Sequence, residues 1–153
     1  MVAAAPAPVR TPASTQVALH PDGGRVAALL QPLDPRMRRC VPKALPPGYG
    51  WPYQDAARAY VLDGHPAIAM YATSGSGHSV LWMFTTWSDP PILDNPSATR
   101  RAGGRTLDLY TDSGHLRQIA WNVGPTRVWI TNTLRNELTN AQMLALATSC
   151  RVP

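Results

Sequence analysis

Two arginines and a tryptophan are the residues of this sequence whose types and spacing best suit binding chemistry. Arg127 and Trp129 are two residues apart in a segment that alternates as a β-strand does, so they share a face. Arg117 lies in the preceding segment, where a hairpin would bring it across from them. A guanidinium bonds phosphate or carboxylate in a bidentate way, and an indole covers an apolar surface. The three residues form a candidate site for an anionic glycopolymer or lipid, unless Trp129 is buried under the C-terminal helix and Arg127 is merely solvated.

Signals for catalysis and for metal binding are weaker. The four histidines lie at or next to predicted turns, and the sequence has no Gly-x-Ser-x-Gly nucleophile elbow. Ser79 follows His78 directly, but neighbours in sequence do not by themselves have the geometry of a catalytic pair. Asp108 and Asp112 belong to a set of carboxylates that would act as acid and base only if the fold paired them. We therefore expect no catalytic residues, no cofactor and no metal.

The two cysteines, Cys40 and Cys150, bracket the region that is predicted to fold. They do not form a zinc site by themselves, because no histidine stands at ligand spacing. We therefore expect a disulfide between them, with two unrelated buried thiols as the alternative. Closing a loop of roughly a hundred residues stabilises a fold by about 4–5 kcal/mol at most. Such a bond would place the protein in an oxidising compartment.

Length and charge limit the other possibilities. The chain has 153 residues and a formal net charge of +5 at pH 7. The length predicts a single domain with one core. The charge favours anionic partners, but the arginines are scattered and no nucleic-acid-binding motif is present, so nucleic acid is not an expected partner. No apolar run reaches the roughly 18 residues that a membrane-spanning helix needs.

The N-terminal part of the chain differs in composition from the rest. Residues 1–25 begin with an Ala/Pro-rich stretch that has no hydrophobic period, which predicts a disordered linker. Residues 26–153 are expected to form a single extracytoplasmic domain. The first residues lack the charged start and apolar centre of a signal peptide. We therefore expect an export signal or membrane anchor upstream of residue 1.

Three segments with a period of two position the candidate site. Asp112–Gly114 predicts a tight turn after the first, and Gly124–Pro125 ends the second because proline has no N–H to donate. Short turns between sequential strands predict an antiparallel meander. Arg127 and Trp129 are then on the face opposite to Val128. The segments are 106–111, 118–123 and 126–132.

Further strands are expected before this meander. Segments 59–62 and 67–71 flank Asp63–Gly64, a strong signal for a two-residue hairpin. Segment 80–87 is apolar on both faces and predicts a central strand. Segment 88–104 contains three prolines and two glycines, and it predicts a long loop of the kind often tied to function or mobility.

A C-terminal helix has the clearest signals of all the expected elements. Thr139 and Gln142 fit a capping box, and Leu138 and Met143 have the spacing of a hydrophobic staple across it. The apolar positions recur at helical spacing, so one face of the helix should lie on the sheet. These positions are Met143, Leu146, Ala147 and Cys150.

These elements together predict an α+β domain. We expect a curved antiparallel β-sheet of about five to seven strands with the C-terminal helix packed on one face. Trp82 and Trp121 are assigned to the core because a tryptophan side chain buries a large apolar area.

The segment GGRTLDLYTDSGHLRQIAWNVGPTRVWITNTLRNELTNAQMLALATS resembles extracytoplasmic domains of actinobacterial envelope proteins. It is similar to a segment that accompanies cell-wall proteins of the LytR-CpsA-Psr type, and to the strand–strand–helix ending of Gram-positive anti-sigma-factor ectodomains. The resemblance covers about a third of the chain, with a weaker echo in ALPPGYGW. The arginines and acidic residues of the LytR-CpsA-Psr catalytic domain have no matching positions here, so no catalytic role is carried over.

The resemblance implies a location outside the membrane, secreted or anchored, near the cell wall. We expect a non-enzymatic accessory or sensing module that binds a wall or lipid component, with another envelope protein as a possible partner. The first alternative is a lipid carrier with a hydrophobic cavity, and the second is a wall-polymer transferase. A deep apolar cavity would favour the carrier, a flat Trp/Arg surface the binding module, and converging carboxylates the enzyme.

Overall fold

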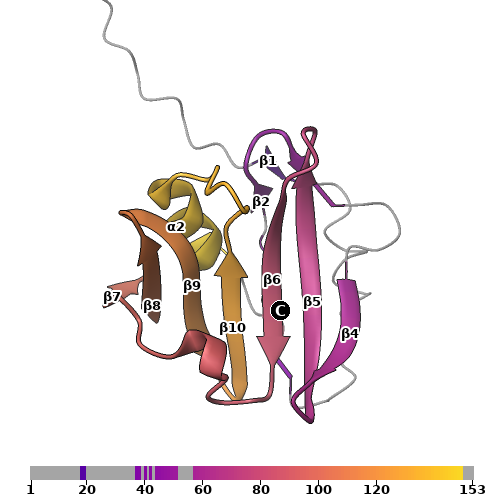
Figure 1. Cartoon of the computed structure of the whole chain (residues 1–153), viewed down its shortest axis with the longest axis vertical. Helices are drawn as coiled ribbons and strands as arrows, with labels where there is room; N and C mark the ends of the chain where they lie inside the picture. The colour runs from indigo at the N-terminus through magenta and orange to yellow at the C-terminus, as the bar shows by residue number, and fades with distance from the viewer. Residues whose placement is uncertain are drawn as a thin grey trace, which may run out of the picture.

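The computed structural model describes residues 18–19, 37–38, 40, 42, 44–51 and 57–149. Most of them belong to one antiparallel sheet of eight strands (Figure 1). Its strands are β3 (Tyr49–Gly50), β4 (Ala57–Leu62), β5 (His65–Ser74), β6 (Ser79–Thr85), β7 (Ala98–Ala102), β8 (Arg105–Asp112), β9 (His115–Val123) and β10 (Thr126–Thr131).

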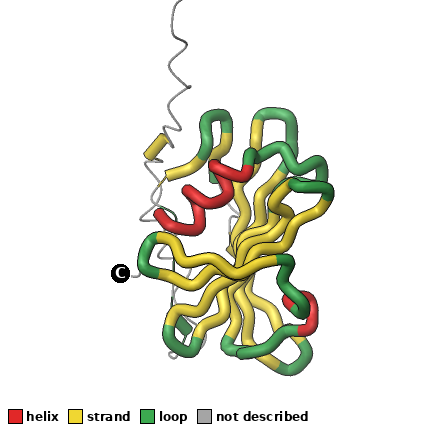
Figure 2. The backbone as a smooth tube through the Cα atoms, turned by 90° about the vertical axis from the view of Figure 1, so that its left-hand side faces the viewer, coloured by secondary structure: helices red, strands yellow, loops and turns green. Residues whose placement is uncertain are grey.

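The strand order of this sheet is β3-β5-β6-β10-β9-β8-β7, and β4 pairs with β5 as well. The sheet is open and curved, with the α-helix α2 (Asn140–Ser149) on one face (Figure 2). The predicted α+β class is therefore confirmed. β10 follows β9 in sequence but also pairs with β6, which joins the N-terminal and C-terminal parts of the sheet.

Two further short strands form a separate pair. β1 (Ala18–Leu19) pairs antiparallel with β2 (Ala44–Leu45). Apart from β1, the predicted linker over residues 1–25 lies outside the described residues, as does the apolar run over residues 26–30.

The predicted hairpin turns are present. Asp63 and Gly64 have φ values of 47° and 81°, and they join β4 to β5 with Leu62 opposite His65. Ser113 and Gly114 have φ values of 50° and 81° in the turn between β8 and β9. Two central residues with positive φ make the turn type whose twist matches that of the flanking strands, which is why glycine and a small polar residue stand there.

The prediction of a long loop over residues 88–104 was wrong, because the segment contains regular structure. It contains a 3-10 helix, η1 (Pro91–Leu93), and the edge strand β7. The residues of β7, ATRRA, are exposed except for the last, so the strand lacks the apolar alternation that would have revealed it. Its backbone pairing with β8 holds it in the sheet. β7 and the two-residue β3 bring the number of strands to eight.

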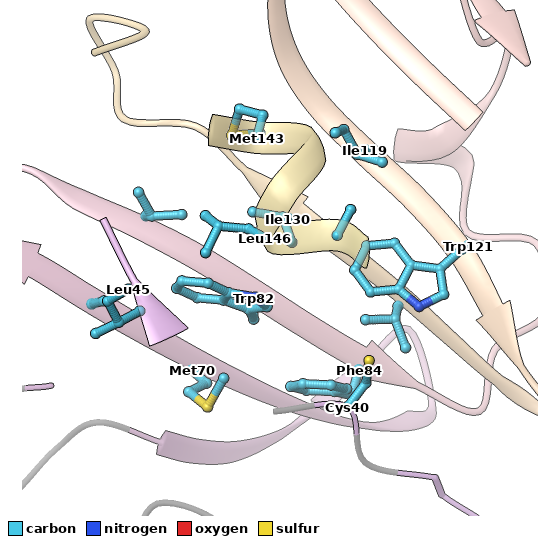
Figure 3. Packing of buried hydrophobic residues seen from close by; sticks show 14 of the residues in the cluster. Cys40, Leu45, Met70, Trp82, Phe84, Ile119, Trp121, Ile130, Met143 and Leu146 are labelled. Carbon is cyan, nitrogen blue, oxygen red and sulfur yellow. The ribbon is translucent and has the colours of Figure 1, made fainter. Parts of the chain in front are cut away.

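The main core lies between α2 and the sheet. Figure 3 shows Trp82, Ile130 and Leu146 gathered there, all fully buried. Trp121 belongs to the same cluster, so the assignment of Trp82 and Trp121 to the core is confirmed. The alternation predicted for β9 and β10 supplies this cluster with Ile119, Trp121, Val128 and Ile130.

The predicted start of the helix is confirmed in detail. The backbone N–H of Gln142 donates to Thr139 Oγ1 at 3.1 Å, and the N–H of Thr139 donates to Gln142 Oε1 at 2.9 Å. Leu138 and Met143, the predicted staple, are both buried in the main core. This reciprocal cap fixes where α2 begins.

Within the described residues, no helix has both the length and the apolar character to cross a membrane.

The structure describes only one of the two cysteines of the predicted disulfide. Cys40 is fully buried in the main core, in the cluster that also contains Ala147 of α2. Cys150 lies outside the described residues, so the bond between the two cysteines stays a prediction.

Candidate ligand-binding pocket

A second, smaller hydrophobic cluster lies on the sheet face opposite α2. The strand register places Trp129 between Met83 of β6 and Ala120 of β9. These three residues pack with Leu93 of η1, which covers them from outside the sheet. Figure 2 shows η1 and α2 on opposite sides of the sheet. The Pro-rich segment before β7 therefore acts as a cover for this face.

A pocket of about 500 Å³ adjoins this cluster. Most of its lining is apolar and comes from β6, β10, the end of β4, the segment that leads into η1 and the first two residues of η1. The polar lining is contributed by β9 and the end of β10. The apolar residues are Leu62, Leu81, Met83, Trp87, Pro90, Pro91, Ile92 and Trp129, and the polar ones are Arg117, Gln118 and Thr131.

Arg117 is the only charged residue among the described residues that line the pocket. Its Nη1 donates to the carbonyl oxygen of Asn132 at 2.9 Å, to that of Thr133, and to Asn136 Oδ1 at 3.3 Å. All three acceptors are neutral. Among the described residues, no carboxylate lies within salt-bridge distance of Arg117. The guanidinium is therefore oriented by the loop after β10 while its charge is not neutralised there.

The other two polar residues of the pocket stand beside Arg117. Gln118 and Thr131 are cross-strand partners, and Gln118 Nε2 donates to Thr131 Oγ1 at 3.2 Å. Both side chains are half-buried. Each of them keeps further hydrogen-bonding capacity beyond this bond, since an amide has two N–H groups and an oxygen, and a hydroxyl both donates and accepts.

Arg127, the second arginine predicted for the site, has a different role. Its Nη2 donates to Asp108 Oδ2 at 2.7 Å and its Nη1 to Asn122 Oδ1 at 3.4 Å. Arg127 is only 9% exposed and does not line the pocket. Its charge is neutralised within the protein, so the structure separates it from Arg117.

Trp129 is on the predicted face of β10 but does not have the predicted exposure. It is 2% exposed, because Leu93 of η1 packs over it. The expectation of an exposed tryptophan was therefore wrong, and so was the alternative that α2 buries it, since α2 is on the other face. Trp129 is one of the residues that line a pocket, and at 2% exposure it does not offer a flat stacking surface.

Contacts at both ends hold the covering segment against the sheet. Tyr110 of β8 donates its hydroxyl to the carbonyl oxygen of Leu93 at 2.5 Å. Burial raises the pKa of the Tyr110 phenol; Arg127 opposes this shift and Asp108 adds to it. At the other end, the rings of His65 and Trp87 stack with centroids 4.8 Å apart and planes 11° apart. Trp87 is thereby fixed as a wall of the pocket.

A cluster of titratable side chains lies elsewhere, at the tip of the β5–β6 hairpin. His78 Nδ1 contacts Glu137 Oε1, and Tyr49 donates to Glu137 Oε2 at 3.3 Å. Ser76 Oγ is 3.3 Å from the same Nδ1 atom of His78. In a Ser-His-acid triad the serine and the acid contact different ring nitrogens. The cluster therefore lacks triad geometry, and it ties the hairpin to the segment before α2.

The chain was compared with protein-family models, with curated proteins and with solved structures. No match was found in any of the three comparisons. Among the residues that the structure describes, no group of three or more His, Cys, Asp or Glu side chains is placed to hold a metal ion.

Sequence reasoning found two of the pocket's residues, Arg117 and Trp129, and missed most of the others. Gln118 and Thr131 were placed on strands by alternation, but nothing in the sequence showed that they flank Arg117 in space. The lining residues Pro90, Pro91 and Ile92 belong to segment 88–104, which the sequence had already indicated as a loop of the kind often tied to function. The missing signal was the direction in which that segment folds back.

Proposed function

We propose that this protein is a non-enzymatic module of the cell envelope that binds the apolar part of a lipid or wall component over Trp129. The pocket of about 500 Å³, with apolar walls and one polar end, carries this proposal. Its volume is within the range of pockets that hold small-molecule ligands, and such pockets combine apolar walls with a few placed polar groups.

Of the two expected ligand classes, a lipid fits the lining better than a glycopolymer does. A sugar chain carries hydroxyl groups, and each of them needs a hydrogen-bond partner when it leaves water. The lining offers three polar residues, all of them at one end, and apolar side chains elsewhere. An acyl or similar chain needs no such partners, and its burial is favourable.

A binding role is favoured over a catalytic one by the composition of the lining. Among the described residues that line the pocket, Arg117 has no carboxylate, histidine, serine or cysteine beside it to act as acid, base or nucleophile. The envelope location rests on the resemblance of residues 103–149 to actinobacterial envelope domains and on the predicted bond between Cys40 and Cys150.

A lipid carrier is the second candidate, and the apolar lining of the pocket favours it. Trp129 is 2% exposed, because Leu93 of η1 packs over it. A carrier must release its ligand into a second membrane, whereas a sensing module need not. Transfer of a fluorescent lipid between two vesicle populations separates them, because only a carrier accelerates it.

The proposed function is tested by filling the pocket. Leu81→Trp adds bulk to a half-buried position of the lining, and we expect it to weaken binding of dodecanol or dodecanoate by about tenfold or more, because less apolar surface is buried. Leu134→Trp, at a position that is 91% exposed and outside the lining, is the matched control. The readout is isothermal titration. If the unsubstituted protein binds neither probe but retains a soluble anionic wall polymer, the lipid assignment fails.

A further inference from the structure

We infer that the ligand of this pocket is a single-chain amphiphile that ends in a carboxylate, bound with the carboxylate on Arg117 and the chain between Trp129 and the segment that leads into η1. The inference rests on the proposed function and adds the head group, its position and the direction of the chain.

The first step is the state of Arg117. Its Nη1 is held by three neutral oxygens from the loop after β10, so the plane of the guanidinium is fixed. Nη2 and Nε make no hydrogen bond with the described residues. No carboxylate of the described residues neutralises this half-buried cation at the end of an apolar pocket, so an anion of the ligand would complete it. The side of the guanidinium that carries Nη2 and Nε suits a bidentate oxyanion.

The second step concerns the charge of that anion. Arg117 supplies one positive charge, and its neighbours Gln118 and Thr131 are neutral hydrogen-bonding groups. A carboxylate carries one negative charge and places two oxygens against such a set. A phosphate monoester carries about −1.5 to −2 at pH 7, which would leave excess negative charge against an apolar wall. The lining therefore favours a carboxylate over a phosphate monoester.

The third step is the path of the chain. Leu81 and Met83 are two residues apart on β6 and pair with Thr131 and Trp129 of β10, so their side chains are on one face of the sheet. Leu81, Met83 and Trp129 all line the pocket and form an apolar floor that begins next to Thr131. Trp87 and Ile92 also line the pocket, and Ile92 is 61% exposed. A chain that starts at Arg117 would run along this floor, and each methylene it buries strengthens binding by about fourfold.

The experiment measures dissociation constants for dodecanoate, dodecanol and dodecyl phosphate by tryptophan fluorescence. For the unsubstituted protein we expect dodecanoate to bind at least about tenfold more tightly than dodecanol, because a hydrogen bond to a charged partner is among the stronger ones. Arg117→Gln should remove this preference. Arg100→Gln, the same change of charge at an exposed position outside the pocket, should keep it.

Each outcome decides a separate question. Equal binding of dodecanoate and dodecanol overturns the head-group assignment and leaves the proposed function standing, whereas binding of neither overturns the proposed function. Tighter binding of dodecyl phosphate than of dodecanoate overturns the choice of a carboxylate. If Arg117→Gln does not fold, Gln118→Leu serves instead, with the expectation of a severalfold smaller preference for dodecanoate. An unchanged preference in that folded variant overturns the geometry proposed here.

Discussion

Arg127 of β10 and Asp108 of β8 form an ion pair that spans the strand between them. Nη2 and Oδ2 are 2.7 Å apart, although β9 separates the two strands. The pairing passes over Ala120, which lies opposite Asp108 and has a small side chain. The pair therefore ties three strands together on the face that carries the pocket.

Loss of this pair should destabilise the fold without abolishing the pocket. For Arg127→Met we expect a loss of about 1–3 kcal/mol in the free energy of unfolding, since Asp108 then lacks its charged partner. Urea denaturation followed by circular dichroism measures the loss. The control is Arg127→Met with Asp108→Asn, which should recover part of it. A midpoint that does not move in the single variant would show that the pair contributes nothing.

Trp129→Ala should behave as a core substitution. The side chain is 2% exposed and packs against Met83, Ala120 and Leu93, so we expect a loss of about 3–5 kcal/mol of stability. Thermal and urea denaturation check this value. Trp87→Ala, at a half-buried position of the same pocket, should cost less. An unchanged melting temperature for Trp129→Ala would restore the exposed surface that the sequence suggested.

The contact between Tyr110 and Leu93 predicts an alkaline loss of stability. The pKa of the Tyr110 phenol is raised in the folded protein, chiefly by burial. Above about pH 10 the unfolded phenol ionises before the folded one, so stability falls as pH rises toward the folded pKa and is unaffected at pH 7. Tyr110→Phe should show a smaller fall between pH 9 and pH 11 than the unsubstituted protein. This variant should also be less stable by about 1 kcal/mol in the free energy of unfolding at pH 7, because it lacks the hydrogen bond to Leu93.

Tyr49 provides the comparison for that experiment. Burial and Glu137 raise the pKa of its phenol as well, and Tyr49, which pairs with Ser74 of β5, does not line the pocket. Tyr49→Phe should therefore reduce the alkaline fall without changing ligand binding. Identical pH profiles for the two variants and the unsubstituted protein would contradict both assignments.

The bond between Cys40 and Cys150 is checked directly by mass. Non-reducing mass spectrometry of protein from an oxidising host should give a mass about 2 Da lower than that of the reduced chain, since two hydrogens are lost. In Cys40→Ser, Cys150 would have no partner, so its thiol should react with an alkylating reagent. Two freely alkylated thiols in the unsubstituted protein would remove the disulfide, and with it one support for an extracytoplasmic location.

Local signals in the sequence were sufficient for most of the fold. Thr139 and Gln142 predicted the start of α2, and Asp63–Gly64 predicted a hairpin, because caps and tight turns depend on residues that are close together in the chain. Alternation placed Arg127 and Trp129 on one face for the same reason. The strand β7 was not predicted, because backbone pairing with β8 holds it in the sheet and it has no apolar face that would give a period of two.

The candidate site could be predicted only in part. Arg117 and Trp129 were chosen for their chemistry, but exposure depends on what folds over a face, and Leu93 is 36 residues away from Trp129 in sequence. The separate roles of Arg117 and Arg127 follow from Asp108 and Asn132, which belong to other segments. Such long-range pairings leave no periodic signal in a single sequence.

The central claim is that a ligand binds over Trp129, beneath the segment that leads into η1, and methyl NMR tests this position most directly. Dodecanoate and dodecanol would be added in turn to protein labelled at the methionine methyl groups. Met83 lines the pocket, whereas Met70 and Met143 lie in the core on the α2 side. We predict that the Met83 resonance shifts on titration and that those of Met70 and Met143 stay in place. Shifts at Met70 and Met143 with Met83 unchanged, or no shift at any methionine, would contradict the account.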